Sequence, residues 1–129
     1  RGYFTEANYE LLTEKMLKAL TKHGINITAV YHCPHYEDGK IQKFSIKCTC
    51  RKPAPGLILR AAKELNIDLK SSILIGDKIS DVFCARAAGI ETIGLIKTDG
   101  SDNTLSLRKE EYASVNLYEV VRRILKSKQ

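Results

Sequence analysis

One short apolar run constrains the fold of this chain more than any other stretch. Residues 72–76 read Ser-Ile-Leu-Ile-Gly, and Asp77 follows immediately. Such a run is typical of a parallel strand covered on both faces, because a strand with one solvated face alternates between apolar and polar residues. The run therefore predicts a buried strand of an α/β sheet, with a carboxylate directly beyond its carboxyl end.

Helical and strand patterns alternate along the rest of the chain. Apolar residues at helical spacing predict helices over residues 6–22, 55–65, 80–88 and 117–125. Apolar or β-branched runs predict further strands at residues 25–31, 91–96 and 112–115. This alternation predicts one domain over residues 1–129, with a three-layer, Rossmann-like α/β fold and a mainly parallel sheet. In such sheets ligands bind beyond the carboxyl ends of the strands, where both Cys33 and Asp77 fall.

Charge and hydropathy narrow the classes of function. The net charge of +6 fits an anionic ligand, from nucleic acid to a small phosphate ester. The excess is spread over the solvent side of the first helix and the carboxyl-terminal tail, which favours a solvated surface over a nucleic-acid patch. No run approaches the roughly 20 apolar residues of a membrane-spanning helix, and nothing resembles a signal peptide. A cytoplasmic, monomeric protein that binds neither membrane nor nucleic acid is the expectation.

Residues 33–50 carry a candidate zinc site. Cys33-x-His35 and Cys48-x-Cys50 place three thiols and one imidazole in two tight pairs that bracket a loop. This set matches a closed, tetrahedral structural site with no position for a reacting water. A loop of this length without secondary structure is uncommon in a compact domain, and a metal would hold it. The alternative is four incidental residues, with cysteine acting as a small apolar residue, which is the interpretation we give to Cys84.

Asp77 and Asp81 form a second candidate site, in the run Gly76-Asp77-Lys78-Ile79-Ser80-Asp81. A carboxylate at a strand end can bind a hard cation such as Mg²⁺, and Gly76 lets the backbone approach a ligand closely. The spacing of four brings Asp81 near Asp77 once the helix begins. Equally, Asp77 or Ser80 could simply cap that helix.

Arg51 and Lys52 directly follow the pair Cys48 and Cys50. A lysine held between a metal-bound loop and a helix that starts with proline can neutralise phosphoryl oxygens, and Arg51 can bind a second anionic group. An Arg-Lys pair with no further context is usually solvated surface.

Together these residues resemble the haloacid dehalogenase superfamily of phosphatases. Gly76-Asp77-Lys78-x-x-Asp81 resembles the fourth motif of that superfamily, and Lys52 the third. The Cys-x-His and Cys-x-Cys-Arg-Lys-Pro combination resembles the branch of D-glycero-D-manno-heptose 1,7-bisphosphate 7-phosphatases, with histidinol-phosphate phosphatases as relatives. The twelve residues between the two candidate ligand pairs, from His35 to Cys48, favour the heptose branch.

The resemblance implies a role for each candidate residue. Cys33, His35, Cys48 and Cys50 would hold zinc, and Asp77 would bind Mg²⁺. Lys52 would stabilise the transferring phosphoryl group, and Asp81 would support Lys52 or the outer shell of the metal. Arg51 and Lys78 would recognise a sugar phosphate. The activity implied is hydrolysis of the 7-phosphate of heptose bisphosphate, in a route to nucleotide-activated heptose for surface glycans such as lipopolysaccharide.

The chain departs from the family at its amino-terminal side. The family's Asp-x-Asp motif on the first strand and its Ser/Thr motif have no counterpart, because the only Asp before Asp68 is Asp38, within the zinc loop. The sheet of the family places that strand in the middle. We therefore expect roughly 40–60 preceding residues, judged by the size of a βα unit, and no turnover by residues 1–129 alone. A non-catalytic, zinc-stabilised module that binds nucleic acid or protein is the alternative from another class.

Overall fold

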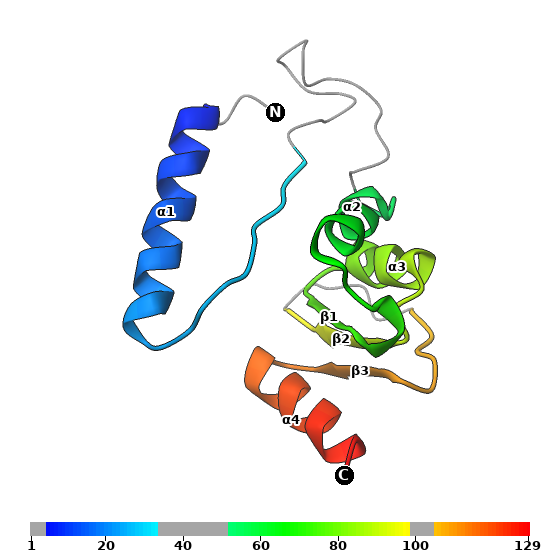
Figure 1. The fold of residues 1–129 in the computed structure, drawn as a ribbon. Helices are drawn as coiled ribbons and strands as arrows, with labels where there is room; N and C mark the ends of the chain where they lie inside the picture. Colours follow the sequence, from blue (N-terminus) through cyan, green and yellow to red (C-terminus); the bar gives the residue numbers. More distant parts are fainter. Residues whose placement is uncertain (1–4, 34–51, 99–104) are drawn as a thin grey trace. The chain divides into compact units, whose positions relative to one another are not determined.

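The computed structural model describes residues 5–33, 52–98 and 105–129. The chain divides into two units, Arg1–Cys48 and Thr49–Gln129 (Figure 1). Each unit has its own secondary structure and is described by itself.

The first unit is built on helix α1, Glu6–Lys22, at the predicted position. Thr5 caps it, because the Asn8 backbone N–H donates to the Thr5 hydroxyl oxygen at 3.1 Å while the Thr5 N–H donates to the Asn8 side-chain oxygen at 3.3 Å. Two orphan donors of the first turn are thereby satisfied. At the other end Gly24 adopts a φ of +76°, a conformation that glycine takes at little cost.

The predicted strand over residues 25–31 is wrong for the described part of the chain. The segment is extended but forms no strand ladder, and Ile25, Ile27 and Val30 are exposed. Its β-branched side chains would suit the pleated surface of a sheet. A strand also needs a neighbouring strand to pair with, and composition does not indicate whether one is present. The Tyr9 and His32 rings, 4.0 Å apart between centroids, are a contact within this unit.

The second unit contains a three-stranded, all-parallel sheet in the order β1-β2-β3. The strands are β1 Ile73–Gly76, β2 Thr92–Ile96 and β3 Glu111–Ser114. Ile75 lies beside Gly94, and Gly94 beside Tyr112, which fixes the register. The three strands predicted within this unit are confirmed to within a residue at each end, and the α/β class with a parallel sheet is confirmed.

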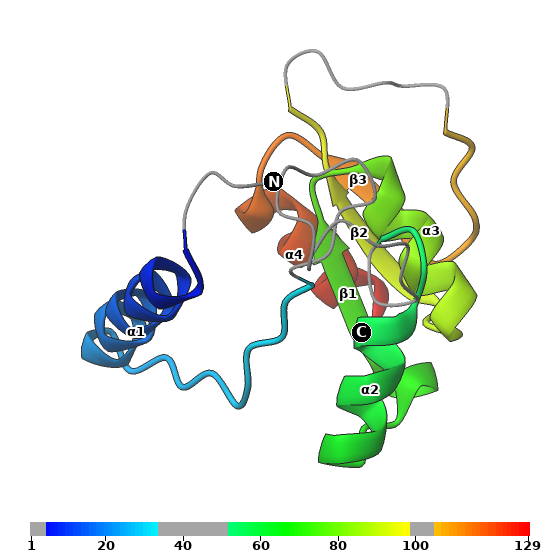
Figure 2. The same ribbon diagram turned by 90° about the horizontal axis from the view of Figure 1, so that it is seen from above.

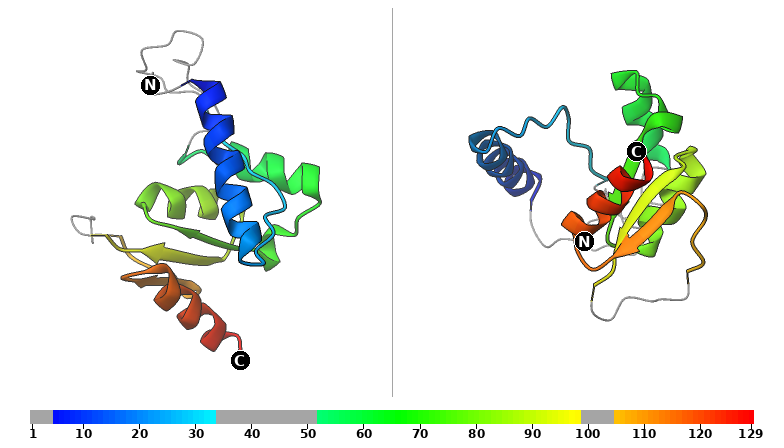
Figure 3. Two further views of the ribbon diagram at one scale, coloured as in Figure 1. Left: turned by 90° about the vertical axis from the view of Figure 1, so that its left-hand side faces the viewer. Right: turned by 90° about the horizontal axis from the view of Figure 1, so that it is seen from below.

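Helices cover both faces of this sheet (Figures 2 and 3). They are α2 Gly56–Leu65, the 3₁₀ turn η2 Leu69–Ser71, α3 Ile79–Ala88 and α4 Leu117–Ser127. Helix α3 packs on β1 and β2, α2 packs on α3, and α4 packs on β2 and β3 from the opposite side. In the residues that the structure describes, every helix is too short or too polar to cross a membrane.

The core lies between α3 and the sheet and continues to α4. Its members are buried aliphatic side chains, with Val82, Ala85, Ile90, Ile93 and Leu95 on one side and Val120 and Ile124 on the other. Gly94 permits the contact with α4, since a Cβ there would collide with Val120 and lie 3.3 Å from Ile124. The α4 helix can therefore lie directly on β2.

A buried ion pair joins α3 to the start of β3. The Arg86 Nε–H donates to Glu111 Oε2 at 2.8 Å, and the guanidinium also donates to the Ser106 carbonyl at 2.9 Å. Hydrogen bonding from Arg86 holds the pKa of the Glu111 carboxyl below its usual value, against the cost of burial. This pair lies at the amino ends of the strands, away from Asp77.

Candidate active site

The candidate site begins where β1 ends. Asp77 and Lys78 follow Gly76 directly, and α3 starts at Ile79. Both side chains are exposed at the carboxyl edge of the sheet. This edge is where ligands bind in open α/β sheets.

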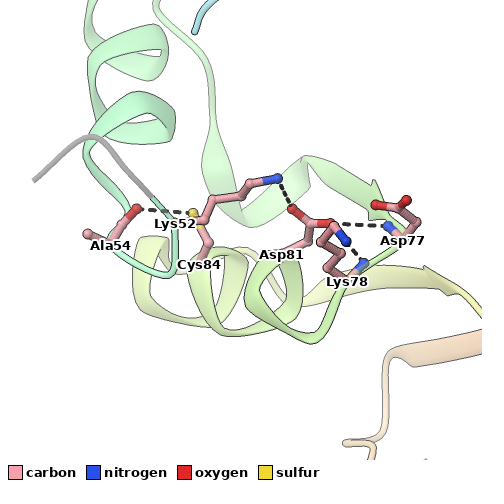
Figure 4. A network of polar contacts seen from close by, with 6 residues as sticks. All are labelled: Lys52, Ala54, Asp77, Lys78, Asp81 and Cys84. Atoms are coloured by element: carbon pink, nitrogen blue, oxygen red, sulfur yellow. Dashed lines mark hydrogen bonds and ion pairs between the residues drawn. The ribbon is translucent and has the colours of Figure 1, made fainter. Parts of the chain in front are cut away.

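The Asp81 carboxylate connects the parts of the site (Figure 4). Its Oδ2 accepts from the backbone N–H groups of Asp77 and Lys78, both at 3.1 Å. Its Oδ1 forms an ion pair with the Lys52 ammonium. Asp81 is only 6% exposed, so these contacts replace the water it has lost. One buried carboxylate thus fixes both the turn that carries Asp77 and the side chain of Lys52.

These hydrogen bonds also show how the start of helix α3 is capped. Sequence reasoning offered Asp77 or Ser80 as the cap of α3. In the structure the N-cap residue is Lys78, and Asp81, at the third helical position, reaches back to accept from the N–H groups of Lys78 and Asp77, just before the helix. Asp77 is therefore not used as a cap, and its carboxylate is exposed.

The absence of a side chain at Gly76 serves a different purpose from the close approach of a ligand that the sequence predicts. A Cβ at residue 76 would lie 2.5 Å from both Cβ and Cγ of Asp81. The space that the missing side chain leaves is filled by Asp81, whereas we expected it to admit a ligand. Gly76 is thus what allows Asp81 to fold back over the end of β1.

Sequence reasoning missed a contact of Cys84. Its side chain is buried, as expected, but its Sγ–H also donates to the Ala54 carbonyl at 3.3 Å. Burial raises the pKa of the Cys84 thiol. The spacing of three from Asp81 places both side chains on one face of α3, but it does not identify Ala54 as the partner.

The candidate metal ligands divide between described and undescribed residues. Cys33 is half-buried at the end of the described part of the first unit, while His35, Cys48, Cys50 and Arg51 lie outside the described residues. No three His, Cys, Asp or Glu side chains gather as a metal site within the described ranges. The exposed Asp77 carboxylate suits a hard cation. Asp81 does not suit direct ligation, because both of its oxygens are already engaged.

The fold and this edge of the sheet define a class of protein. Residues 49–123 match the HAD-hydrolase-like family model, so the chain belongs to the haloacid dehalogenase hydrolase-like family. A heptose 1,7-bisphosphate 7-phosphatase of Photorhabdus laumondii (the α-anomer enzyme) is 48% identical over 98 residues, 76% of this chain and 54% of its own length. The β-anomer enzyme of Yersinia pestis is 47% identical, over 76% of this chain and 52% of its own length.

Two solved structures share the fold. The D,D-heptose 1,7-bisphosphate phosphatase of B. bronchiseptica, complexed with magnesium and phosphate, aligns with a TM-score of 0.76 at 28% identity, over 98% of this chain and 68% of its own. A HAD-like phosphatase of Mesorhizobium loti aligns with a TM-score of 0.80 at 25% identity, over 97% and 58%. The chain spans about half the length of the curated relatives that it matches.

Proposed function

We propose that this chain is part of a Mg²⁺-dependent phosphatase that removes the 7-phosphate of D-glycero-D-manno-heptose 1,7-bisphosphate. The observation that carries the proposal is the Asp81 carboxylate, which holds Lys52 and the Asp77 turn together at the carboxyl edge of the sheet. The names of two relatives at 47–48% identity give the substrate class, and a magnesium- and phosphate-bound structural neighbour supports the cation.

The described residues would contribute binding and charge. Lys52, whose side chain is 51% exposed, would place its ammonium against a phosphoryl oxygen. Asp77 would hold Mg²⁺, which supplies Lewis-acid stabilisation of the phosphoryl charge. Lys78, and Arg51 in the undescribed stretch, would bind the sugar phosphate. Zinc on Cys33, His35, Cys48 and Cys50 would hold the loop of residues 33–50 and so keep Arg51 in place.

The nucleophile of this reaction would come from a segment preceding the first helix. A carboxylate there would attack phosphorus, the sugar oxygen would leave, and water would release phosphate from the resulting aspartyl-phosphate. We place this segment as a strand beside β1, because in the described sheet β1 has a strand on one side only and Ile73 is 46% exposed. Covering that edge would satisfy unpaired backbone groups and apolar surface.

Phosphate release by the protein translated from its complete coding sequence tests the proposal. With Mg²⁺, we expect release from heptose 1,7-bisphosphate, and a loss of at least about a hundredfold in kcat for Lys52→Ala, since removing one charge-stabilising group costs this much. Lys126→Ala, on the exposed end of α4, is the control and keeps full activity. Residues 1–129 alone should release no phosphate.

Two results would count against the proposal. If histidinol phosphate were hydrolysed faster than the heptose ester at equal enzyme concentration, the substrate would be wrong. If the complete protein hydrolysed no phosphomonoester, the activity would be wrong. In the latter case, salt-sensitive binding of DNA would favour a non-catalytic module, for which the relatives give no support. A monomeric enzyme of the cytoplasm, acting ahead of surface-glycan assembly, completes the proposal.

A further inference from the structure

Two side chains of α3 hold the same short segment of chain. Asp81 and Cys84 lie three residues apart, so they share a helix face. Asp81 binds the Lys52 ammonium, and the Cys84 thiol donates to the Ala54 carbonyl at 3.3 Å. Figure 4 shows both contacts reaching the segment that runs into α2. Residues 52–54 are therefore fixed to α3 at a side chain and at the backbone.

The hydrogen bond from the Cys84 thiol constrains the backbone of residues 52–54, which the ion pair between Lys52 and Asp81 does not. Lys52 reaches Asp81 through four flexible methylene groups, so the ion pair alone places the ammonium and not the backbone beneath it. The Ala54 carbonyl, two residues further on, belongs to that backbone. Ala54 is half-buried, and the buried thiol of Cys84, 2% exposed, supplies a donor to its carbonyl.

The chemistry of Cys84 suits a donor better than a reactive thiol. Burial holds the pKa of its thiol above the usual value, so the sulfur keeps its proton. A thiolate could not donate to a carbonyl. Alanine would remove both the sulfur and the donor, whereas serine would keep a donor in nearly the same space.

We propose that Cys84 is a positioning residue for Lys52: its thiol holds the backbone of residues 52–54 against α3 and so sets where the lysine ammonium meets a phosphoryl oxygen. This inference rests on the proposed function for the role of Lys52. The contact itself can be tested without any turnover.

Steady-state kinetics of the full-length enzyme test the role. We expect Cys84→Ala to lower kcat/KM about fivefold, because small misplacements of a catalytic group have large effects on rate. Cys84→Ser keeps a donor and should recover the rate to within about twofold of wild type. In a Lys52→Ala background the effect of Cys84→Ala should vanish, since residues acting through one another are not additive. The matched control, Val82→Ala, removes buried volume from α3 and should lower thermal stability while keeping kcat/KM.

Alkylation of Cys84 by iodoacetamide, followed by mass spectrometry of its peptide, tests the contact. Lys52→Ala releases one of the two attachments of residues 52–54, so Cys84 should react several-fold faster than in wild type or in Arg60→Ala, an exposed α2 control. Equal alkylation rates in wild type and Lys52→Ala would overturn the inference, and so would an undiminished effect of Cys84→Ala in the Lys52→Ala background. A wild-type enzyme without phosphatase activity would defeat the proposed function, and the alkylation rates would then decide whether Cys84 holds the segment.

Discussion

At residue 76 the backbone has no room for a side chain, and the reason is Asp81. A methyl group on Gly76 would occupy the space of the Asp81 Cβ and Cγ. Because Asp81 also binds Lys52 and the Asp77 turn, displacing it would disturb the whole carboxyl edge of the site. Gly94 has the same steric limit, but its neighbour is Val120 of α4, which has no part in the site.

These two glycines make a matched pair of substitutions. Gly76→Ala and Gly94→Ala should each destabilise the fold by about 1–3 kcal/mol, the usual cost of overpacking. Only Gly76→Ala should also reduce phosphatase activity of the full-length enzyme at a temperature where both variants are folded. Thermal denaturation and kcat/KM measured on the same preparations check this. Equal activity losses in the two variants would show that Gly76 matters only for stability.

Local patterns in the sequence located the site residues, and only the family resemblance offered a connection between them, as one of two roles for Asp81. Asp77 and Asp81 were found from their position after an apolar run, a local signal. The ion pair between Lys52 and Asp81 spans 29 residues, and no local pattern encodes a contact of that separation. The hydrogen bond from Cys84 to Ala54, across 30 residues, was missed for the same reason.

Among the elements, α3 carries contacts at both of its ends. Asp81 in its first turn serves the candidate site, while Arg86 in its last turn is paired with Glu111 at the start of β3. The side chains of Arg86 and Glu111 are 14% and 2% exposed, so this pair is largely shielded from water. Breaking one partner of such a pair leaves a buried charge uncompensated.

The Arg86–Glu111 pair predicts how stability depends on pH. The pKa of Glu111 is lowered from its usual 4.5, so its folded state binds protons less readily than the unfolded state. The contribution is therefore full above about pH 4.5 and declines as pH falls through the folded pKa. Glu111→Gln should cost about 3 kcal/mol at pH 7 and flatten the acid side of the stability profile. The free energy of unfolding, measured by urea denaturation at intervals of about 1 pH unit between pH 3 and pH 7, checks this prediction.

A matched control separates the pair from surface charge. Glu64→Gln removes a carboxylate whose partner, Arg60, lies four residues away on the exposed face of α2. It should change stability by less than about 0.5 kcal/mol and leave the acid profile unaltered. If Glu64→Gln and Glu111→Gln changed the dependence of stability on pH equally, the interpretation of the Arg86–Glu111 pair would be wrong.

Elements of the second unit were predictable because their signals are local. The apolar run of β1, the glycine after α3 and the helical spacing of α4 each identify an element without reference to the rest of the fold. Residues 25–31 have an equally clear strand composition and are not a strand. The difference is that a strand also needs a partner, and composition carries no information about one.

At the scale of the whole molecule, the zinc proposal concerns residues that lie mostly outside the described ranges. It is testable by metal content. The purified protein should contain about one zinc per chain, and Cys48→Ser or Cys50→Ser should lose it, because structural zinc requires its full ligand set. Cys84→Ala is the matched cysteine control and should keep its zinc. Elemental analysis after dialysis decides, and zinc retained in both ligand variants would refute the proposed site.

The two oxygens of Asp81 also limit which residues this position can accept. Asparagine has the same shape, but its one amide oxygen can satisfy either Lys52 or the backbone N–H groups of Asp77 and Lys78, and its NH₂ would then face a donor. Glutamate has both oxygens, but its extra methylene would carry them away from the positions at which Asp81 meets Lys52 and the two N–H groups. Neither substitution keeps all three contacts, so a change at residue 81 should disturb Lys52 and the Asp77 turn together.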